Sequence, residues 1–175
     1  MKRAVAVRTA GTWTPPPEAG TITLPYDQRH RRRIRMEDDR GLPFLLDLPN
    51  AVLLADGDGL EMEDGGVVMV KAARERVADL HFDRAMDAMR VAWHVGNRHT
   101  AVQVLSDRTL RIAHDHVLVA MAEGLGARAE ELVAPFQPEG GAYASGHGHA
   151  HSHGHGHGHG HGHEQGHGHG HTHGH

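Results

Sequence analysis

Short runs of alternating apolar and polar residues occupy the first part of the chain, from about residue 20 to residue 71. The alternation is clearest at residues 22–26, 34–36 and 42–48. A period of two predicts strands with one buried face. Asp-Gly sequences at residues 56–59 and 64–66 have the composition of tight turns. We therefore expect a small all-β domain over residues 1–73.

The pattern changes near residue 74, after which apolar residues recur four, three and four positions apart. These residues are Phe82, Met86, Met89 and Trp93. This spacing is typical of one face of an α-helix, and we expect that face to be the buried one. Asp83 is the expected N-cap of this helix, and Gly96 with Asn97 is expected to end it.

Two strands, at residues 100–105 and 110–113, are predicted to follow the first helix. A second helix, capped by Asp115, and a last strand at residues 128–133 complete the pattern. With a strand that ends near Leu80, the order is strand, helix, strand, strand, helix, strand. This is the ferredoxin-like βαββαβ arrangement, in which two helices cover one face of an antiparallel sheet. The predicted fold class is α+β, with a ferredoxin-like domain over residues 74–143.

Histidine and glycine dominate the rest of the chain, residues 144–175, which hold 14 of the 20 histidines. Their few apolar side chains cannot bury a core that offsets chain entropy, so we expect a disordered tail. Imidazole binds nickel, zinc and copper, so the tail is predicted to bind several metal ions. The candidate ligands are His147, His149, His151, His153, His155, His157, His159, His161, His163, His167, His169, His171, His173 and His175.

Composition restricts the chemistry of any metal site. The chain has no cysteine, so its metal ligands must be nitrogen and oxygen atoms. The formal charge of −4 counts every histidine as neutral. Imidazole titrates near pH ~6.5, so mild acidification makes the tail cationic and weakens metal binding.

The apolar runs are short throughout the chain. The run that begins at Ala4 is interrupted by Arg8, which is too early for a signal peptide. No run approaches the ~20 apolar residues of a membrane span. We expect a cytoplasmic protein that has no membrane partner.

The sequence His114-Asp115-His116 is a second candidate metal site. If the preceding strand continues through it, both imidazoles point to one face, about 6.5–7 Å apart at Cα, and can share an ion. If Asp115 caps a helix instead, its carboxylate binds backbone amides and is not a free ligand. A third interpretation is two exposed histidines at a strand-to-helix corner.

His99 follows the end of the first predicted helix. A single histidine at this position is commonly a cation at the helix C-terminus or a solvated surface group. One imidazole does not hold a metal ion tightly, so His99 forms a site only if a twofold axis brings a second copy close. We interpret His94 as a surface residue, and His30 and His81 as structural or solvated residues.

Arginine is concentrated at residues 29–35, where it occupies five of seven positions. Such a run is compatible with nucleic-acid binding. However, acidic residues follow directly at 37–39, and no aromatic side chains are interleaved for base stacking. We expect a solvated strand face, or a surface for an anionic protein partner, and no nucleic acid.

Three segments together resemble the urease accessory nickel metallochaperone family. They are Ala-Trp-His-Val-Gly-Asn-Arg-His at 92–99, His-Asp-His-Val-Leu at 114–118 and Pro-Phe-Gln-Pro-Glu-Gly-Gly-Ala-Tyr at 135–143. Their order and spacing match that family, and a histidine-rich tail follows as it often does there. Residues 47–51 and 54–58 resemble the family's β-rich N-terminal domain.

The resemblance implies a homodimer in which His99 from both subunits binds one nickel ion. It implies that His114 and His116 are auxiliary ligands and that the tail histidines are further ligands. It also implies an N-terminal domain that engages partner proteins. Nickel would be delivered to the urease apoprotein through a complex with the urease accessory GTPase.

Two other functions are compatible with the same histidines. One is nonspecific storage or buffering of nickel, zinc or copper, because nitrogen ligands alone do not select among these metals. The other is metal-dependent hydrolysis by His99, His114 and His116, which requires an enclosed cleft and a general base. The sequence contains no His-Glu-x-x-His framework, and we expect the protein not to be an enzyme.

Overall fold

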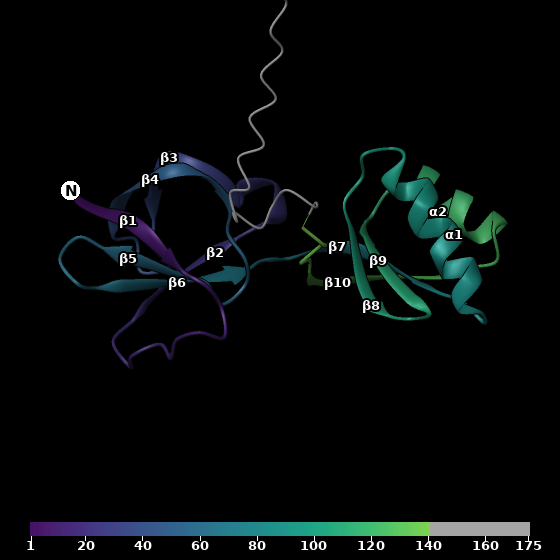
Figure 1. Ribbon diagram of the computed structural model, residues 1–175, viewed down its shortest axis with the longest axis horizontal. Coiled ribbons are helices and arrows are strands. Elements are labelled where there is room, and N and C mark those ends of the chain that lie inside the picture. Colours follow the sequence, from purple (N-terminus) through teal and green to yellow (C-terminus); the bar gives the residue numbers. More distant parts are fainter. Residues whose placement is uncertain (141–175) are drawn as a thin grey trace, which may run out of the picture. The chain divides into compact units, whose positions relative to one another are not determined.

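The computed structural model describes residues 1–140, which form two β-sheets and two α-helices (Figure 1). The fold is therefore α+β, as predicted. The expected tail at residues 144–175 lies outside the described residues. Within residues 1–140, neither helix is long and apolar enough to cross a membrane.

The N-terminal sheet contains six strands in the order β2-β6-β5-β1-β4-β3. Their bounds are β1 (Lys2–Arg8), β2 (Gly20–Leu24), β3 (His30–Glu37), β4 (Pro43–Leu53), β5 (Gly59–Met62) and β6 (Val67–Ala72), with a short 3-10 helix η1 (Tyr26–Gln28). The pairs β1–β4 and β2–β6 are parallel and the other neighbours are antiparallel. Alternate side chains of these strands, such as Leu46 and Val70, fill a common apolar core.

The alternating runs predicted as strands are confirmed as β2, β3 and β4, but β1 was not predicted. The run Ala4–Val7 contains four consecutive apolar residues and therefore lacks an alternating signal. Only Ala4 from this strand is fully buried, with Val7 packed at the margin of the core. The strand forms because β4 and β5 pair with its two edges.

Asp39, just after β3, hydrogen-bonds to β2 at the opposite edge of the N-terminal sheet. Its backbone N–H donates to the Thr21 carbonyl at 2.7 Å. Its carboxylate accepts from the Thr23 N–H at 2.9 Å and from the Thr21 and Thr23 hydroxyls at 2.6 and 2.9 Å. Asp39 therefore connects the two edge strands of the sheet, β3 and β2, and the sheet is curled.

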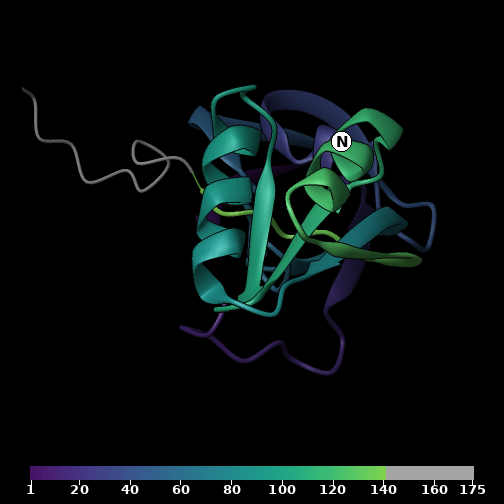
Figure 2. The ribbon, with the colours of Figure 1, turned by 90° about the vertical axis from the view of Figure 1, so that its right-hand side faces the viewer.

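The second sheet contains four antiparallel strands in the order β10-β7-β9-β8. The elements of this part are β7 (Arg74–His81), α1 (Ala85–Gly96), β8 (Val102–Ser106), β9 (Thr109–Ala113), α2 (His116–Gly124) and β10 (Arg128–Pro135). Both helices cover the same face of the sheet (Figure 2), where Val91, Leu118 and Ile112 share one core. The predicted ferredoxin-like order is confirmed.

The buried face of α1 is not the predicted one. Met86, Met89 and Trp93 are 58%, 56% and 64% exposed, while the helix residues Ala88, Val91 and Val95 are buried. The sequence contains two apolar stripes, and the smaller side chains face the sheet. Consequently, a stripe of three large apolar side chains lies on the outer face of the helix.

The start of α1 also differs from the prediction. The N-cap position is Arg84, which makes no side-chain cap, and the helix begins at Ala85. Asp83 lies outside the helix, 3.6 Å from Arg128. Phe82 is buried but precedes the helix, so it is not part of the helical stripe.

Candidate metal-binding site

His99 lies in the turn that closes α1. Its backbone N–H donates to the Gly96 carbonyl at 2.9 Å, and the Thr100 N–H donates to the Val95 carbonyl at 3.3 Å. This pair of bonds is the Schellman pattern, which places its central residue in the left-handed region. His99 accordingly has φ 54°, and it is the one non-glycine residue with positive φ among those described.

Glycine is the usual residue at such a position, because a Cβ atom there costs about 1–2 kcal/mol. Histidine is therefore present at a position where backbone conformation favours glycine. Conformational strain of this kind is concentrated at functional sites. The side chain of His99 is exposed, so its imidazole is accessible to a metal ion or to a second molecule.

The exposed stripe of α1 leads to the helix end that carries His99. Trp93 is the last of its three members, and its ring lies edge-on to the His94 ring at a centroid distance of 4.9 Å. His94 is half-buried, and its carbonyl accepts a hydrogen bond from Arg98 at 2.9 Å. His94 was expected at the surface, but it is half-buried against Trp93, whereas His99 is the exposed histidine of this turn.

Asp115 caps α2, so the second alternative for His114-Asp115-His116 is correct. Its carboxylate accepts from the N–H groups of Val117 and Leu118 at 2.8 and 3.0 Å. The hydrogen bond from Leu118, together with that from Val117, lowers the pKa of Asp115. The strand β9 ends at Ala113, and His116 is the exposed first residue of α2.

His114 is enclosed, with a side chain only 20% exposed, and its Nε2 atom lies 3.0 Å from Oε1 of Glu131. The hydrogen bond from His114 lowers the pKa of Glu131, and Arg76 adds a second cation 3.5 Å from the other carboxylate oxygen. Sequence reasoning missed Glu131, because this contact depends on the pairing of β10 with β7. Nothing in the local sequence indicates it.

The structure does not bring the three candidate histidines together. Among residues 1–140 no group of three or more histidine, aspartate or glutamate side chains is placed to hold a metal ion. His99 lies at the end of α1, whereas His114 and His116 lie at the junction of β9 and α2. This arrangement provides no enclosed hydrolytic centre built from His99, His114 and His116.

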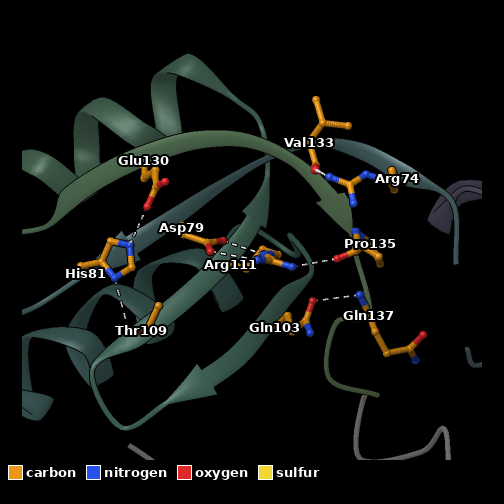
Figure 3. A network of polar contacts seen from close by, with 10 residues as sticks. All are labelled: Arg74, Asp79, His81, Gln103, Thr109, Arg111, Glu130, Val133, Pro135 and Gln137. Carbon is orange, nitrogen blue, oxygen red and sulfur yellow. Dashed lines mark hydrogen bonds and ion pairs between the residues drawn. The ribbon is translucent and has the colours of Figure 1, made fainter.

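The segment after β10 is attached to β8, the strand that begins three residues after His99. The Gln137 N–H donates to the Gln103 side chain at 2.9 Å, as Figure 3 shows. The Glu139 N–H donates to the Val102 carbonyl at 2.8 Å. The described part of the motif, residues 135–140, therefore lies beside β8.

Arg111 supports the same segment from the sheet face opposite the helices. Its guanidinium binds the Asp79 carboxylate and also donates to the Pro135 carbonyl at 2.9 Å (Figure 3). Next to this pair, the His81 ring lies between Glu130, 3.5 Å from Nε2, and the Thr109 hydroxyl, 3.4 Å from Nδ1.

The arginine-rich run is not uniformly solvated, contrary to expectation. Arg29 is fully buried and donates to the Phe136 carbonyl and the Gln137 side chain. Burial lowers its pKa. Arg32, Arg33 and Arg35 on β3 are exposed, so the predicted basic strand face is formed by these later residues.

The N-terminal part has a hollow with a volume of about 510 Å³. Apolar residues from several strands, including Phe44, Met62 and Val68, line it. The ion pair between Lys2 and Asp64, 2.7 Å long, lies at its margin. A hollow of this size and composition accommodates apolar side chains of another molecule.

The fold and these surface positions define an α+β protein with a curled sheet, a ferredoxin-like part and histidines at accessible turns. The model of the N-terminal domain of the UreE urease accessory protein matches residues 2–73, and that of the C-terminal domain matches residues 75–163. The chain belongs to the UreE urease accessory protein family.

Curated relatives agree with the family models. Urease accessory protein UreE of Rhodopseudomonas palustris (strain BisB18) is 47% identical over 144 residues, which cover 82% of this chain and 67% of the relative. The Beijerinckia indica protein of the same name is 45% identical and 82% of each chain is covered. That of Bradyrhizobium sp. (strain BTAi1) is 48% identical, with 82% and 69% covered. All three carry the name of an accessory protein rather than of an enzyme.

Proposed function

We propose that this chain takes part in urease maturation, binding Ni(II) as a homodimer and delivering it to the urease apoprotein. Membership of the UreE family supports this role. The observation that carries it is His99, an exposed imidazole in a backbone conformation that favours glycine. A carrier requires accessible ligands that can both bind and release the metal ion. The exposed imidazole of His99 is such a ligand.

The outer face of α1 is the proposed contact between subunits. Met86, Met89 and Trp93 expose large apolar surfaces side by side, which marks a surface that binds another molecule. Because this stripe leads to His99, a twofold axis near the helix end would bring two copies of His99 to one nickel ion.

The remaining histidines are proposed to have different roles. His114 and His116 serve as auxiliary ligands near the start of α2, and the 14 histidines from His147 to His175 collect ions. All of these ligands bind through nitrogen, so they accept zinc or copper as well as nickel. Selection of nickel for urease then depends on the partner proteins.

The proposed partners are the urease accessory GTPase and the urease apoprotein. The N-terminal part is proposed to engage such proteins, and its apolar hollow of about 510 Å³ supports this assignment. We place this handover in the cytoplasm, and that location stays a prediction.

The alternative function is nonspecific buffering of divalent metals, which the number of histidines in the tail favours. The two functions differ in whether bound nickel reaches a specific acceptor. The decisive experiment is urease activation in a reconstituted system at limiting nickel. The intact protein, the His99→Ala variant and a free peptide of residues 144–175 are each loaded with the same amount of nickel.

A carrier requires the intact protein to activate urease well above both the variant and the peptide. Equal activation by all three would show that the chain only buffers nickel. Protein without added nickel is the control, since it measures metal that is carried through purification.

A further inference from the structure

The imidazole of His114 has one nitrogen engaged and one available. Nε2 lies 3.0 Å from Glu131 Oε1, which is within hydrogen-bond range. Among the residues described, the one buried side-chain nitrogen or oxygen without a partner is Nε of Arg29. Nδ1 of His114 makes no hydrogen bond with another described residue, and the side chain is 20% exposed.

Neighbouring groups hold the backbone of His114 and the carboxylate of Glu131 in place. The His114 backbone N–H donates to the Arg76 carbonyl at 3.0 Å. On its other side, Asp115 is held by its two bonds to the first turn of α2. Arg76 also reaches the second oxygen of Glu131 at 3.5 Å, which favours the ionised carboxylate. An ionised carboxylate accepts hydrogen bonds and cannot donate them.

We propose that Glu131 is a positioning residue that keeps the hydrogen of neutral His114 on Nε2 and presents Nδ1 to the metal ion. This inference rests on the proposed function, because it assigns a ligand atom within the auxiliary site. Metal-binding histidines commonly donate their second N–H to a carboxylate, which sets the tautomer and raises the basicity of the ligating nitrogen.

His116 provides the internal comparison. It is exposed, and among residues 1–140 its side chain has no hydrogen-bond or ion-pair partner. Either of its ring nitrogens is free to bind an ion. The two histidines are therefore unequal ligands, although only Asp115 separates them in the sequence.

A purely structural role of Glu131 would connect β10 to the loop before α2 without affecting metal binding. Loss of the carboxylate would then lower stability but would not change which nitrogen of His114 binds metal. The identity of the ligating nitrogen is therefore the measurement that separates the two roles.

The test uses the full chain labelled with ¹⁵N in its histidine rings and titrated with zinc, a diamagnetic ion that imidazole binds. Long-range ¹H–¹⁵N spectra are recorded at about pH 8, above the ordinary imidazole pKa of about 6.5. The signals of His114 are those missing from the His114→Ala variant. Glu131→Ala is the test variant, and Glu130→Ala, which removes the partner of His81, is the matched control.

We expect zinc to shift Nδ1 of His114 in the wild type and in Glu130→Ala. In Glu131→Ala the affinity at His114 should fall at least tenfold, and Nε2 should take up part of the metal. Glu131→Gln, which retains an acceptor oxygen, should preserve ligation through Nδ1. Ligation through Nε2 in the wild type, or unchanged ligation in Glu131→Ala, would overturn the proposal.

The same spectra distinguish this proposal from the auxiliary role of His114 itself. If zinc moves neither ring nitrogen of His114 in any variant, then His114 is not a ligand and both assignments fail. If zinc binds His114 identically in every variant, the auxiliary role stands and only the role of Glu131 is excluded.

Discussion

The N–H of His99 is hydrogen-bonded to the carbonyl of Gly96 at 2.9 Å, and this bond holds His99 in the left-handed backbone region. A candidate metal ligand is therefore fixed at the exact end of a helix whose outer face is apolar. The turn positions the imidazole through backbone hydrogen bonds. Comparing glycine with alanine at residue 99 therefore separates the effect of backbone strain from the loss of the ligand.

The first prediction compares His99→Gly with His99→Ala in the metal-free protein. Both variants lack the imidazole, but only glycine adopts φ 54° without a steric penalty. We expect His99→Gly to have a free energy of unfolding about 1 kcal/mol higher than His99→Ala. Urea denaturation measures this difference, and equal stabilities would show that the turn relaxes in solution.

The second prediction concerns the pair Asp79–Arg111, whose side chains are 10% and 14% exposed. Removing Asp79 leaves a largely buried guanidinium without its carboxylate, which we expect to cost about 3 kcal/mol. The matched control is Arg128→Ala, which removes an exposed ion pair with Asp83 and should cost less than about 0.5 kcal/mol. If Asp79→Ala and Arg128→Ala destabilise the protein equally, the Asp79–Arg111 pair does not stabilise the sheet more than an exposed ion pair does.

The third prediction concerns pH and Asp39. The Thr21 hydroxyl, with further bonds from Thr23, lowers the pKa of Asp39 in the folded state. A lowered carboxyl pKa stabilises the fold above the ordinary value of about 3.9, and this contribution is lost as pH falls through the lower folded pKa. We expect Asp39→Ala to lower the free energy of unfolding by about 1 kcal/mol at pH 7, a figure reduced for solvent screening.

The stability difference between the wild type and Asp39→Ala should narrow below about pH 4, where the carboxyl group becomes protonated. Denaturant titrations of both proteins at several pH values measure this difference in the free energy of unfolding. Asp27→Ala, in the exposed turn of η1, is the control for a general effect of net charge. A difference that stays constant down to pH 2 would contradict the role of the Asp39 carboxylate.

Some of these features follow from the sequence and others do not. Alternation at residues 42–48 predicts β4 because a strand places every second side chain in the core. The capping role of Asp115 is equally local. In α1, however, the two competing apolar stripes differ in side-chain size, and only the space above the sheet determines that Val91 and Val95 are buried.

Contacts between distant residues could not be predicted at all. Arg29 is separated from Phe136 by 107 positions, and its burial depends on a carbonyl that the fold brings to it. Likewise, the contact of Glu131 with His114 depends on strand pairing. Local patterns identified His99 and His114 as candidates, whereas the groups that position them depend on tertiary structure.

The fourth prediction tests the outer face of α1. Met89→Glu places a charge among exposed apolar side chains, so it should weaken the proposed dimer at least tenfold, or about 1.4 kcal/mol, without unfolding the monomer. Sedimentation of metal-free protein measures the association, and circular dichroism measures the fold. Val133→Glu is the matched control, because Val133 is 51% exposed on β10. If Met89→Glu and Val133→Glu weaken the dimer equally, the contact between subunits does not lie on the outer face of α1.

The last prediction separates the tail from the paired site. A chain ending at Tyr143 retains every core residue of both sheets, so its unfolding midpoint should match that of the full chain. It lacks 14 of the 20 histidines, and each ion takes two to four imidazoles, so it should bind roughly three to seven fewer nickel ions. If two copies of His99 bind one ion, the truncated protein should keep a site that titrates as one nickel per dimer.

Isothermal titration of nickel into the truncated protein counts these sites, and the same titration of truncated His99→Ala is the control. The change should remove the one-per-dimer site and leave any weaker binding at His114 and His116. Protons compete with metal ions for imidazole nitrogen, so nickel binding should weaken as the pH falls. One ion per monomer that persists in truncated His99→Ala would contradict a site shared between subunits, since a ligand on the symmetry axis must serve both chains at once.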